Sequence, residues 1–253
     1  MNEEQIAFLS LYLVYFALSV ILVDSVLVKP IRLLTTFVHE FSHALACWMT
    51  GGSVRGIEVH SNAGGVTKYV GGCRCIIASA GYLGEAFWGM MFVILSGGRL
   101  TSTVAASGLV VALLISLCYA PNRTMVYLNL CYAVLLLGFI YAEWFIFTPL
   151  LNYIVLFYGV FWGFFAIADI HSHTVLRSME RSDAYTLYEE SGRCCLPRCI
   201  GTWWLFIAIS LQILGLWIAL ILLSDECDHT GWIECVFHTN VDDLKFDWNW
   251  DWN

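Results

Sequence analysis

Two histidines and a glutamate in the segment FVHEFSHALAC, residues 37–47, are the side chains of this sequence best suited to chemistry. Their order is H-E-x-x-H, and on an α-helix positions i and i+4 project from the same face. Two imidazoles on one face can bind a zinc ion, and the glutamate can act as general base on a zinc-bound water. Zinc lowers the pKa of that water towards about 7. The motif therefore predicts a hydrolytic zinc site in which His39 and His43 are ligands and Glu40 is the catalytic base.

The residues around the motif follow a helical period. Polar side chains recur on one face, namely Thr36, His39, Glu40, His43, Cys47 and Thr50, while large apolar residues fill most other positions. In a membrane helix such a stripe faces the interior of the bundle or a water-filled cavity. A polar contact between helices, without metal, is the alternative interpretation.

A catalytic zinc site usually has three protein ligands and one open position, so a third ligand is needed. Asp169 is the first candidate, because it ends the apolar run FYGVFWGFFAIAD. Within that run, Gly159 and Gly163 form a GxxxG pattern that lets helices approach closely. Three residues nearby are alternatives: Asp183, His171 and His173. Asp169 could also be a structural carboxylate at a helix end.

The composition is that of a membrane protein. Hydrophobic residues make up 59% of the 253 residues and charged residues 13%, whereas soluble domains have about 45–50% and about 25%. Since a span needs about 20 apolar residues, seven segments qualify: 6–28, 33–50, 76–97, 100–120, 124–147, 150–170 and 203–223. We therefore expect an all-α polytopic bundle of about six to seven transmembrane helices.

The bundle is expected to form one domain over residues 1–224, followed by an acidic, Trp-rich C-terminal tail at 225–253. Two segments within the domain are not spans. Residues 52–72 alternate apolar and polar side chains around the turn sequence SNAGG, which predicts a β-hairpin. An unpaired hairpin edge can accept a peptide strand, although an ordinary surface loop is the alternative. Residues 171–202 are polar and predict a membrane-side loop with one short helix.

Charged residues bear on partners and orientation. The net charge is −8 and no basic stripe is present, which argues against nucleic acid as a partner. Seven spans would place the two ends of the bundle on opposite sides of the membrane. Most basic residues outside the spans would then share the side of the N-terminus, which the positive-inside rule assigns to the cytosol. The glycosylation sequon at Asn122 would lie on that side and stay unmodified.

Ionisable residues within the spans and cysteines near their ends are further candidates for functional residues. Ionisable residues at membrane depth are costly and are therefore functional suspects; beyond the three of the motif these are Asp24, Glu85, Glu143 and Asp169. Five cysteines sit near span ends: Cys73, Cys75, Cys194, Cys195 and Cys199. Palmitoylation, metal binding and no special role are all open for them.

Four segments, in this order, resemble the site-2 protease clan of intramembrane zinc metallopeptidases: HEFSHALAC, GGVT, ASAGYLGEAFWGM and DIHSHTVLRSMERSDA. They are most similar to a small eukaryotic, peptidase-like branch of the clan. The resemblance extends over roughly residues 30–215. It implies cleavage of membrane-embedded substrates, with His39 and His43 binding zinc and Glu40 acting as base.

The resemblance also implies that the hairpin at 52–72 receives substrate as an added strand, and that Asn62 in its turn positions the substrate or the oxyanion. One departure concerns the third ligand. Site-2 proteases take it from an N-P-D-G motif, and this chain has no Asp-Gly pair. Asp169 matches an aspartate of the small branch, and Asp183 matches the aspartate of its Ser-Asp-Ala motif.

Our prediction is an intramembrane zinc metalloprotease whose partners are the lipid bilayer and a membrane-protein or transmembrane-helix substrate. A catalytically inactive relative that binds helices or zinc is the first alternative. A metal or proton transporter is the second, for which no inverted repeat is evident.

Overall fold

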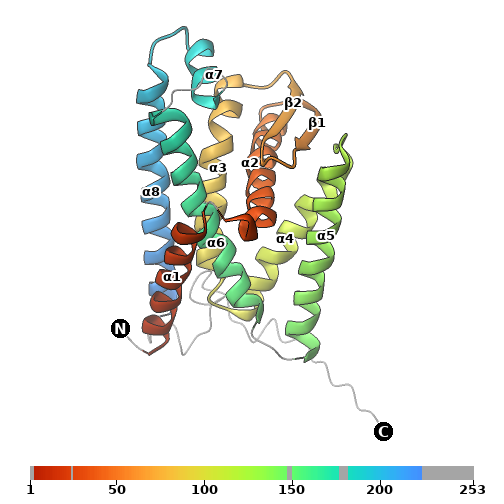
Figure 1. Cartoon of the computed structure of the whole chain (residues 1–253), viewed down its shortest axis with the longest axis vertical. Helices are drawn as coiled ribbons and strands as arrows, with labels where there is room; N and C mark the ends of the chain where they lie inside the picture. The colour runs from red at the N-terminus through yellow and green to blue at the C-terminus, as the bar shows by residue number, and fades with distance from the viewer. Residues whose placement is uncertain (1–2, 24, 147–149, 177–181, 224–253) are drawn as a thin grey trace.

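Eight α-helices and one two-stranded antiparallel sheet form most of the regular structure in a computed structural model that describes residues 3–23, 25–146, 150–176 and 182–223 (Figure 1). In chain order the elements are α1 (Glu3–Leu22), α2 (Lys29–Met49), β1 (Ser53–Val59), β2 (Gly65–Val70), α3 (Arg74–Leu95), α4 (Arg99–Leu117), α5 (Arg123–Tyr141), α6 (Leu150–Asp169), α7 (Asp183–Glu190) and α8 (Pro197–Leu222). Two π-helical stretches, Ala142–Ile146 and Ile170–Leu176, continue α5 and α6.

The predicted fold class is confirmed. In the described part of the chain six helices are long and apolar enough to cross a membrane: α1, α3, α4, α5 and α6 with their continuations, and α8. The hairpin predicted at 52–72 is β1–β2, and the polar segment 171–202 contains the short helix α7. The predicted tail, 225–253, and Asp24 lie outside the described residues.

Helix α2 explains why the structure has six candidate spans rather than seven. It is 21 residues long, but its basic first turn and the polar stripe of the motif make it too polar to count among the candidate spans. Figure 1 shows α1 rising from one end of the bundle and α2 continuing in the same direction to the hairpin. Together these two helices run once along the bundle, from the end where α1 begins to the hairpin end.

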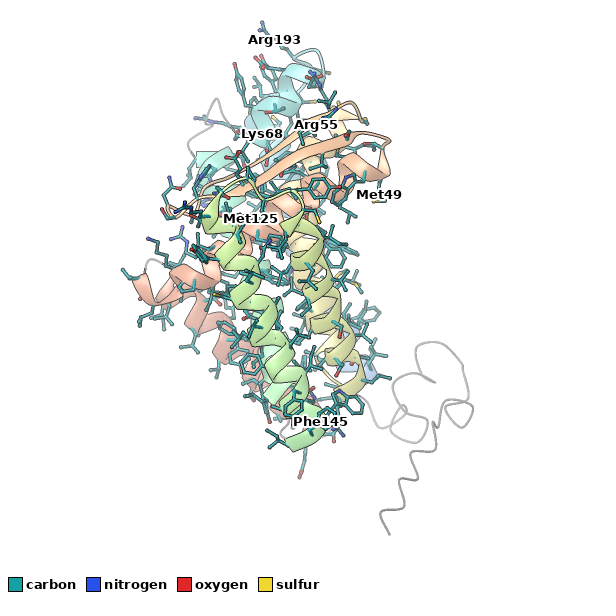
Figure 2. The ribbon with its side chains drawn as sticks, turned by 90° about the vertical axis from the view of Figure 1, so that its right-hand side faces the viewer. Met49, Arg55, Lys68, Met125, Phe145 and Arg193 are labelled. Atoms are coloured by element: carbon teal, nitrogen blue, oxygen red, sulfur yellow. The ribbon has the colours of Figure 1, made fainter. Side chains whose placement is uncertain are left out.

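The two ends of the bundle consequently meet. The Gln5 side-chain amide, in the first turn of α1, donates a hydrogen bond to the carbonyl of Leu220 near the end of α8, at 2.7 Å. The expectation that these ends lie on opposite sides is therefore wrong, because it counted α2 as a separate crossing. Arg55, Lys68 and Arg193 lie at the hairpin end, far from Phe145 at the other end of the bundle (Figure 2). The sequence argument placed the start of α1 on the same side as these basic residues. In the structure it lies at the opposite end of the bundle.

Helix α3 runs through the centre of the bundle and contacts α2, α6 and α8. Glycines allow this close packing. A Cβ at Gly159 of α6 would lie 2.7 Å from the backbone nitrogen of Val93 and 2.9 Å from the carbonyl of Gly89, both on α3. The GxxxG face predicted on α6 is therefore a helix-packing face, as expected.

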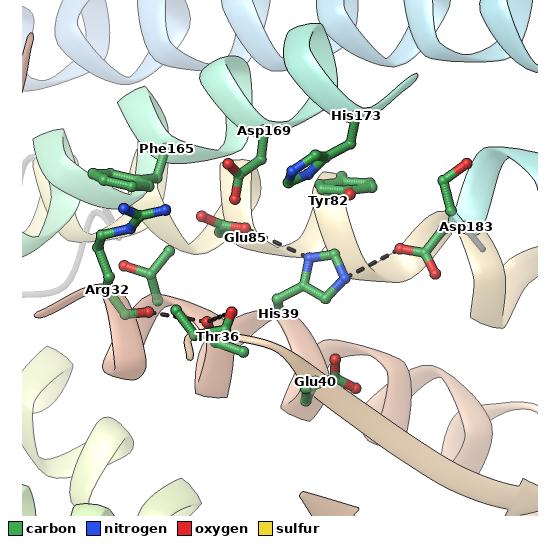
Figure 3. A pocket seen from close by; sticks show the side chains of 14 residues that line it. Arg32, Thr36, His39, Glu40, Tyr82, Glu85, Phe165, Asp169, His173 and Asp183 are labelled. Atoms are coloured by element: carbon green, nitrogen blue, oxygen red, sulfur yellow. Dashed lines mark hydrogen bonds and ion pairs between the residues drawn. The ribbon is translucent and has the colours of Figure 1, made fainter. Parts of the chain in front are cut away.

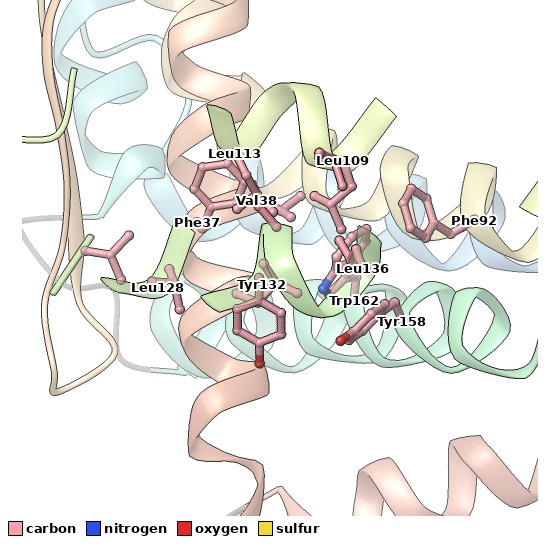
Figure 4. Packing of buried hydrophobic residues seen from close by; sticks show 14 of the residues in the cluster. Phe37, Val38, Phe92, Leu109, Leu113, Leu128, Tyr132, Leu136, Tyr158 and Trp162 are labelled. Atoms are coloured by element: carbon pink, nitrogen blue, oxygen red, sulfur yellow. The ribbon is translucent and has the colours of Figure 1, made fainter. Parts of the chain in front are cut away.

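An apolar core between α2 and the α4–α6 helices supports the other side of α2. Its fully or almost fully buried members include Phe37, Leu113, Leu136 and Trp162 (Figure 4). Because the apolar face of α2 is buried here, its polar stripe turns towards α3 and the hairpin.

The hairpin lies across the upper end of α2, and its two edges differ. On β1, the backbone N–H of Ile57 donates to the carbonyl of Tyr119 at 2.8 Å, and the Asn122 side chain donates to the carbonyl of Val59 at 2.7 Å. The segment between α4 and α5 thus covers the outer edge of β1. The opposite strand, β2, is mostly exposed and borders the polar stripe of α2.

Candidate metal centre

Three side chains converge beside the polar stripe of α2: His39, His43 and Asp183. Figure 3 shows two of them, His39 and Asp183. The Nε2 atoms of His39 and His43 are 3.2 Å apart. Oδ2 of Asp183 lies 3.1 Å from the first nitrogen and 3.4 Å from the second. Ligands about 2.0–2.1 Å from a tetrahedral zinc ion stand about 3.4 Å from one another. The three atoms therefore have the spacing of one face of a zinc coordination tetrahedron.

The far side of each imidazole is held by another group. Nδ1 of His43 is 2.6 Å from the carbonyl oxygen of Ile77 on α3, and because that oxygen can only accept, Nδ1 carries the proton. Nδ1 of His39 lies 3.6 Å from the Glu85 carboxylate, which is 1% exposed. Such contacts fix the ring orientation and leave Nε2 available to a metal.

A glycine provides the space in front of the two nitrogens. A Cβ at Gly81 of α3 would lie 2.5 Å from Nε2 of both His39 and His43. The backbone of α3 can approach the imidazoles only because this residue has no side chain. The donor set, its spacing and this space all fit a zinc ion.

Asp183 is the first residue of α7, outside the candidate membrane spans. Ser182 caps this helix by accepting a hydrogen bond from the Tyr185 N–H at 3.3 Å, and Arg74 of α3 pairs with Glu190 of α7 at 2.7 Å. Burial raises the pKa of Asp183, but the neighbouring His43 and His39 outweigh it and hold that pKa well below its usual range. The carboxylate is thus in the ionised form that a metal ligand requires.

Glu40 lies beside the ligand group, under β2. It is 6% exposed. The hydroxyl of Thr67 on β2 is 2.7 Å from its Oε2 and 2.8 Å from its backbone carbonyl oxygen. A Cβ at Gly65 would lie 2.7 Å from Oε1, so the start of β2 also makes room for the carboxylate.

Four of these side chains line one cavity of about 210 Å³: His39, Glu40, Glu85 and Asp183. A family model described as Peptidase M50B-like matches residues 12–215, which is most of the chain and includes all the residues of this site. The chain belongs to the peptidase M50B-like family. The resemblance to site-2 proteases seen in the sequence is thereby confirmed. No curated protein and no solved structure matches this M50B-like chain.

The geometry of this M50B-like protein does not select Asp169, our first candidate for the third ligand. In the described residues one group of His, Cys, Asp or Glu side chains has metal-ligand spacing, and it contains His39, His43 and Asp183. Asp169 lines the same cavity from α6, with His173 and Arg32 nearby, but its carboxylate is not in the group. The helix that carries Asp169 continues to Leu176, and α7 brings Asp183 to the histidines. His171 is exposed and outside the cavity lining.

Asn62 lies in the hairpin turn, and its role in positioning substrate or the oxyanion stays a prediction. It is exposed, and its side-chain oxygen accepts a hydrogen bond from the Gly64 N–H at 3.2 Å, which stabilises the hairpin turn. Its neighbour Ala63 lines the cavity instead.

Sequence reasoning missed the contacts of two residues in this M50B-like site. Glu85 was a suspect as a buried acid, but its contact with His39 depends on how α3 faces α2. Thr67 lies in the predicted hairpin, where the sequence gives it no role beyond the strand. No local pattern reveals either contact, because both connect different elements.

Proposed function

We propose that this protein is an intramembrane zinc metallopeptidase that hydrolyses peptide bonds of membrane-embedded substrates. The observation that carries the proposal is the convergence of His39, His43 and Asp183 on one point over Gly81, with the Glu40 carboxylate in the same cavity. When bound, zinc supplies Lewis acidity, which polarises a carbonyl oxygen and makes water nucleophilic at neutral pH.

The residues of the chain have distinct roles in this proposal. His39, His43 and Asp183 hold the metal, and Glu85 and the Ile77 carbonyl orient the two imidazoles. Glu40 accepts a proton from the attacking water and delivers it to the leaving amine.

The free edge of β2 is the surface best suited to hold the substrate. The outer edge of β1 is covered, as described above, so β2 is the strand that can pair with an extended peptide. Helix α7 faces the same space: Gly65 and Asp183 line the metal cavity, and Val70 and Glu190 line a second cavity of about 310 Å³. A substrate lying between β2 and α7 would pass the metal centre in an extended conformation, spanning about 20 Å along the six residues of β2.

Metal content gives the first test. Purified protein, supplied with zinc during expression, is expected to contain about one zinc per chain by mass spectrometry. His39→Ala and Asp183→Asn should lose it, while Asp169→Asn should retain it as the matched acidic control from the same cavity. Zinc that survives Asp183→Asn but not Asp169→Asn would reverse the assignment of the third ligand.

Cleavage requires a second test, because a protein that only binds zinc would pass the first. Cells expressing the wild type are compared with cells expressing Glu40→Gln, which should retain zinc. New amino termini in or next to spans of other membrane proteins should appear with the wild type alone. Their absence from a folded, zinc-loaded wild type would leave the inactive relative as the correct reading.

A further inference from the structure

Three exposed cysteines lie together at the start of α8. Cys194 and Cys195 precede the helix, and Cys199 is in its first turn. All three thiols are free. They lie at the hairpin end of the bundle, next to Arg193 (Figure 2) and Arg198. The cluster is separate from the metal centre, and the proposed peptidase reaction does not use it.

Metal binding does not explain the cluster. Within the described ranges, the single group with metal-ligand spacing is the one at His39. The cysteines therefore lack the arrangement of a preformed zinc site, in which thiolates surround one point. Of the roles left open by the sequence, the structure disfavours this one.

The surface below Cys199 suggests another role. Four residues line a hollow of about 510 Å³ on the outside of α8: Cys199, Thr202, Trp203 and Phe206. Their spacing of i, i+3, i+4 and i+7 places them on one face of the helix. Trp203 is 68% exposed and Phe206 is 65% exposed. From Cys199, α8 runs towards the opposite end of the bundle (Figure 1), so this apolar face leads from the thiol along a membrane span.

We propose that Cys199 is an S-acylation site, and that its long-chain fatty acyl group lies in the hollow formed with Thr202, Trp203 and Phe206. The acyl donor is a long-chain acyl-CoA thioester. The Cys199 sulfur attacks the acyl carbonyl, a new carbon–sulfur bond forms, the bond to coenzyme A breaks, and the coenzyme leaves as a thiol that has taken the cysteine proton. No oxidant or reductant is needed.

One further observation concerns the acyl donor, and a second concerns the reactivity of Cys195. Basic residues gather at this end of the bundle, and the positive-inside rule associates such an end with the cytosol, where acyl-CoA is available. Within the cluster, the neighbouring Cys194 raises the pKa of Cys195 and hydrogen-bonds to it. A higher pKa means less thiolate and a less reactive Cys195.

The proposal is tested on the full chain expressed in eukaryotic cells. Free thiols are blocked, thioesters are cleaved with hydroxylamine, and each released thiol is labelled with a polyethylene glycol mass tag. The wild type should show at least one hydroxylamine-dependent step in size. Cys199→Ser should lose one step, while the double variant Cys194→Ser/Cys195→Ser should retain it.

A matched control is Cys131→Ser, which removes an exposed cysteine in the middle of α5 and should leave the pattern unchanged. Mass spectrometry of the intact protein should show a C16 or C18 acyl mass that disappears in Cys199→Ser. If the wild type shows no hydroxylamine-dependent step, or if Cys199→Ser retains every step, the proposal is wrong.

Discussion

Glu40 shows how much of the site depends on single hydrogen bonds. Glu40 comes directly after His39 on α2. Its carboxylate is held in position by Thr67 on β2, whose hydroxyl is 2.7 Å from Oε2. A general base must keep its geometry through proton transfer. The strand that is proposed to receive the substrate therefore also holds the base.

Replacing Thr67 with valine should slow cleavage about 10- to 100-fold, because a hydrogen bond to a charged group contributes about 1.5–3 kcal/mol. Valine keeps the shape and removes the hydroxyl. Cleavage can be followed on any substrate found by the comparison with Glu40→Gln. Thr67→Ser, which keeps the hydroxyl, should recover most of the rate, and zinc content should be the same in all three proteins. Equal slowing by serine and valine would mean that Thr67 acts through packing alone.

The sequence predicted the residues of the motif because their geometry is local. One helical turn places His39, Glu40 and His43, and no other element is needed. The proposed third ligand differs, since both Asp169 and Asp183 are candidates in the sequence and 144 positions separate His39 from Asp183. The choice between them depends on how α6 and α7 are placed relative to α2, which no periodic pattern encodes.

At the scale of elements, the candidate metal centre depends on the close approach of α3 to α2. Gly81 faces both imidazoles, and Gly84 faces Ser42, where a Cβ would lie 2.5 Å from the serine side chain. Small residues on one helix let it approach the polar stripe of the other. The segment ASAGYLGEAFWGM is one of the four that carry the family resemblance. Its first two glycines, Gly81 and Gly84, have this packing role in the structure.

Gly81→Ala should lower zinc content by about tenfold or more, because the added methyl group would lie against both ligand nitrogens and displace them from ligand geometry. Zinc is measured by mass spectrometry and its affinity by competition with a chelator. The control is Gly108→Ala in α4, where nothing lies within 4 Å of the added Cβ. Thermal unfolding in detergent should be recorded for both variants. Normal zinc affinity in a folded Gly81→Ala protein would contradict this account of the site.

At the scale of the whole molecule, the count of crossings decides the orientation. Hydropathy and length predicted the helices well, but they do not show whether successive helices reverse direction. Since α2 continues α1, the hairpin end carries Arg55, Lys68 and Arg193, and the start of α1 lies at the other end. The positive-inside rule then favours a cytosolic hairpin end and an N-terminus on the opposite side.

Glycosylation can test this orientation. The native sequon at Asn122 lies at the hairpin end, so it should stay unmodified in eukaryotic cells, whereas a sequon in an extension added before Met1 should be glycosylated. Both are read as endoglycosidase-sensitive shifts in size. A glycan on Asn122 would place the hairpin end in the lumen, and it would also remove the support that orientation gives to acylation of Cys199.

The position of Asp183 has a consequence for biosynthesis. The two histidines belong to the first crossing, and the aspartate follows the fifth, so a nascent chain carries the imidazoles long before it carries the carboxylate. Helix α7 contacts α3 and α8, and α8 follows α7 in the chain. On the proposed ligand set, a ribosome-bound chain has an incompletely supported centre until the crossing formed by α8 is inserted. Hydrolytic capacity would then arise late in membrane integration, only after α8 has been inserted.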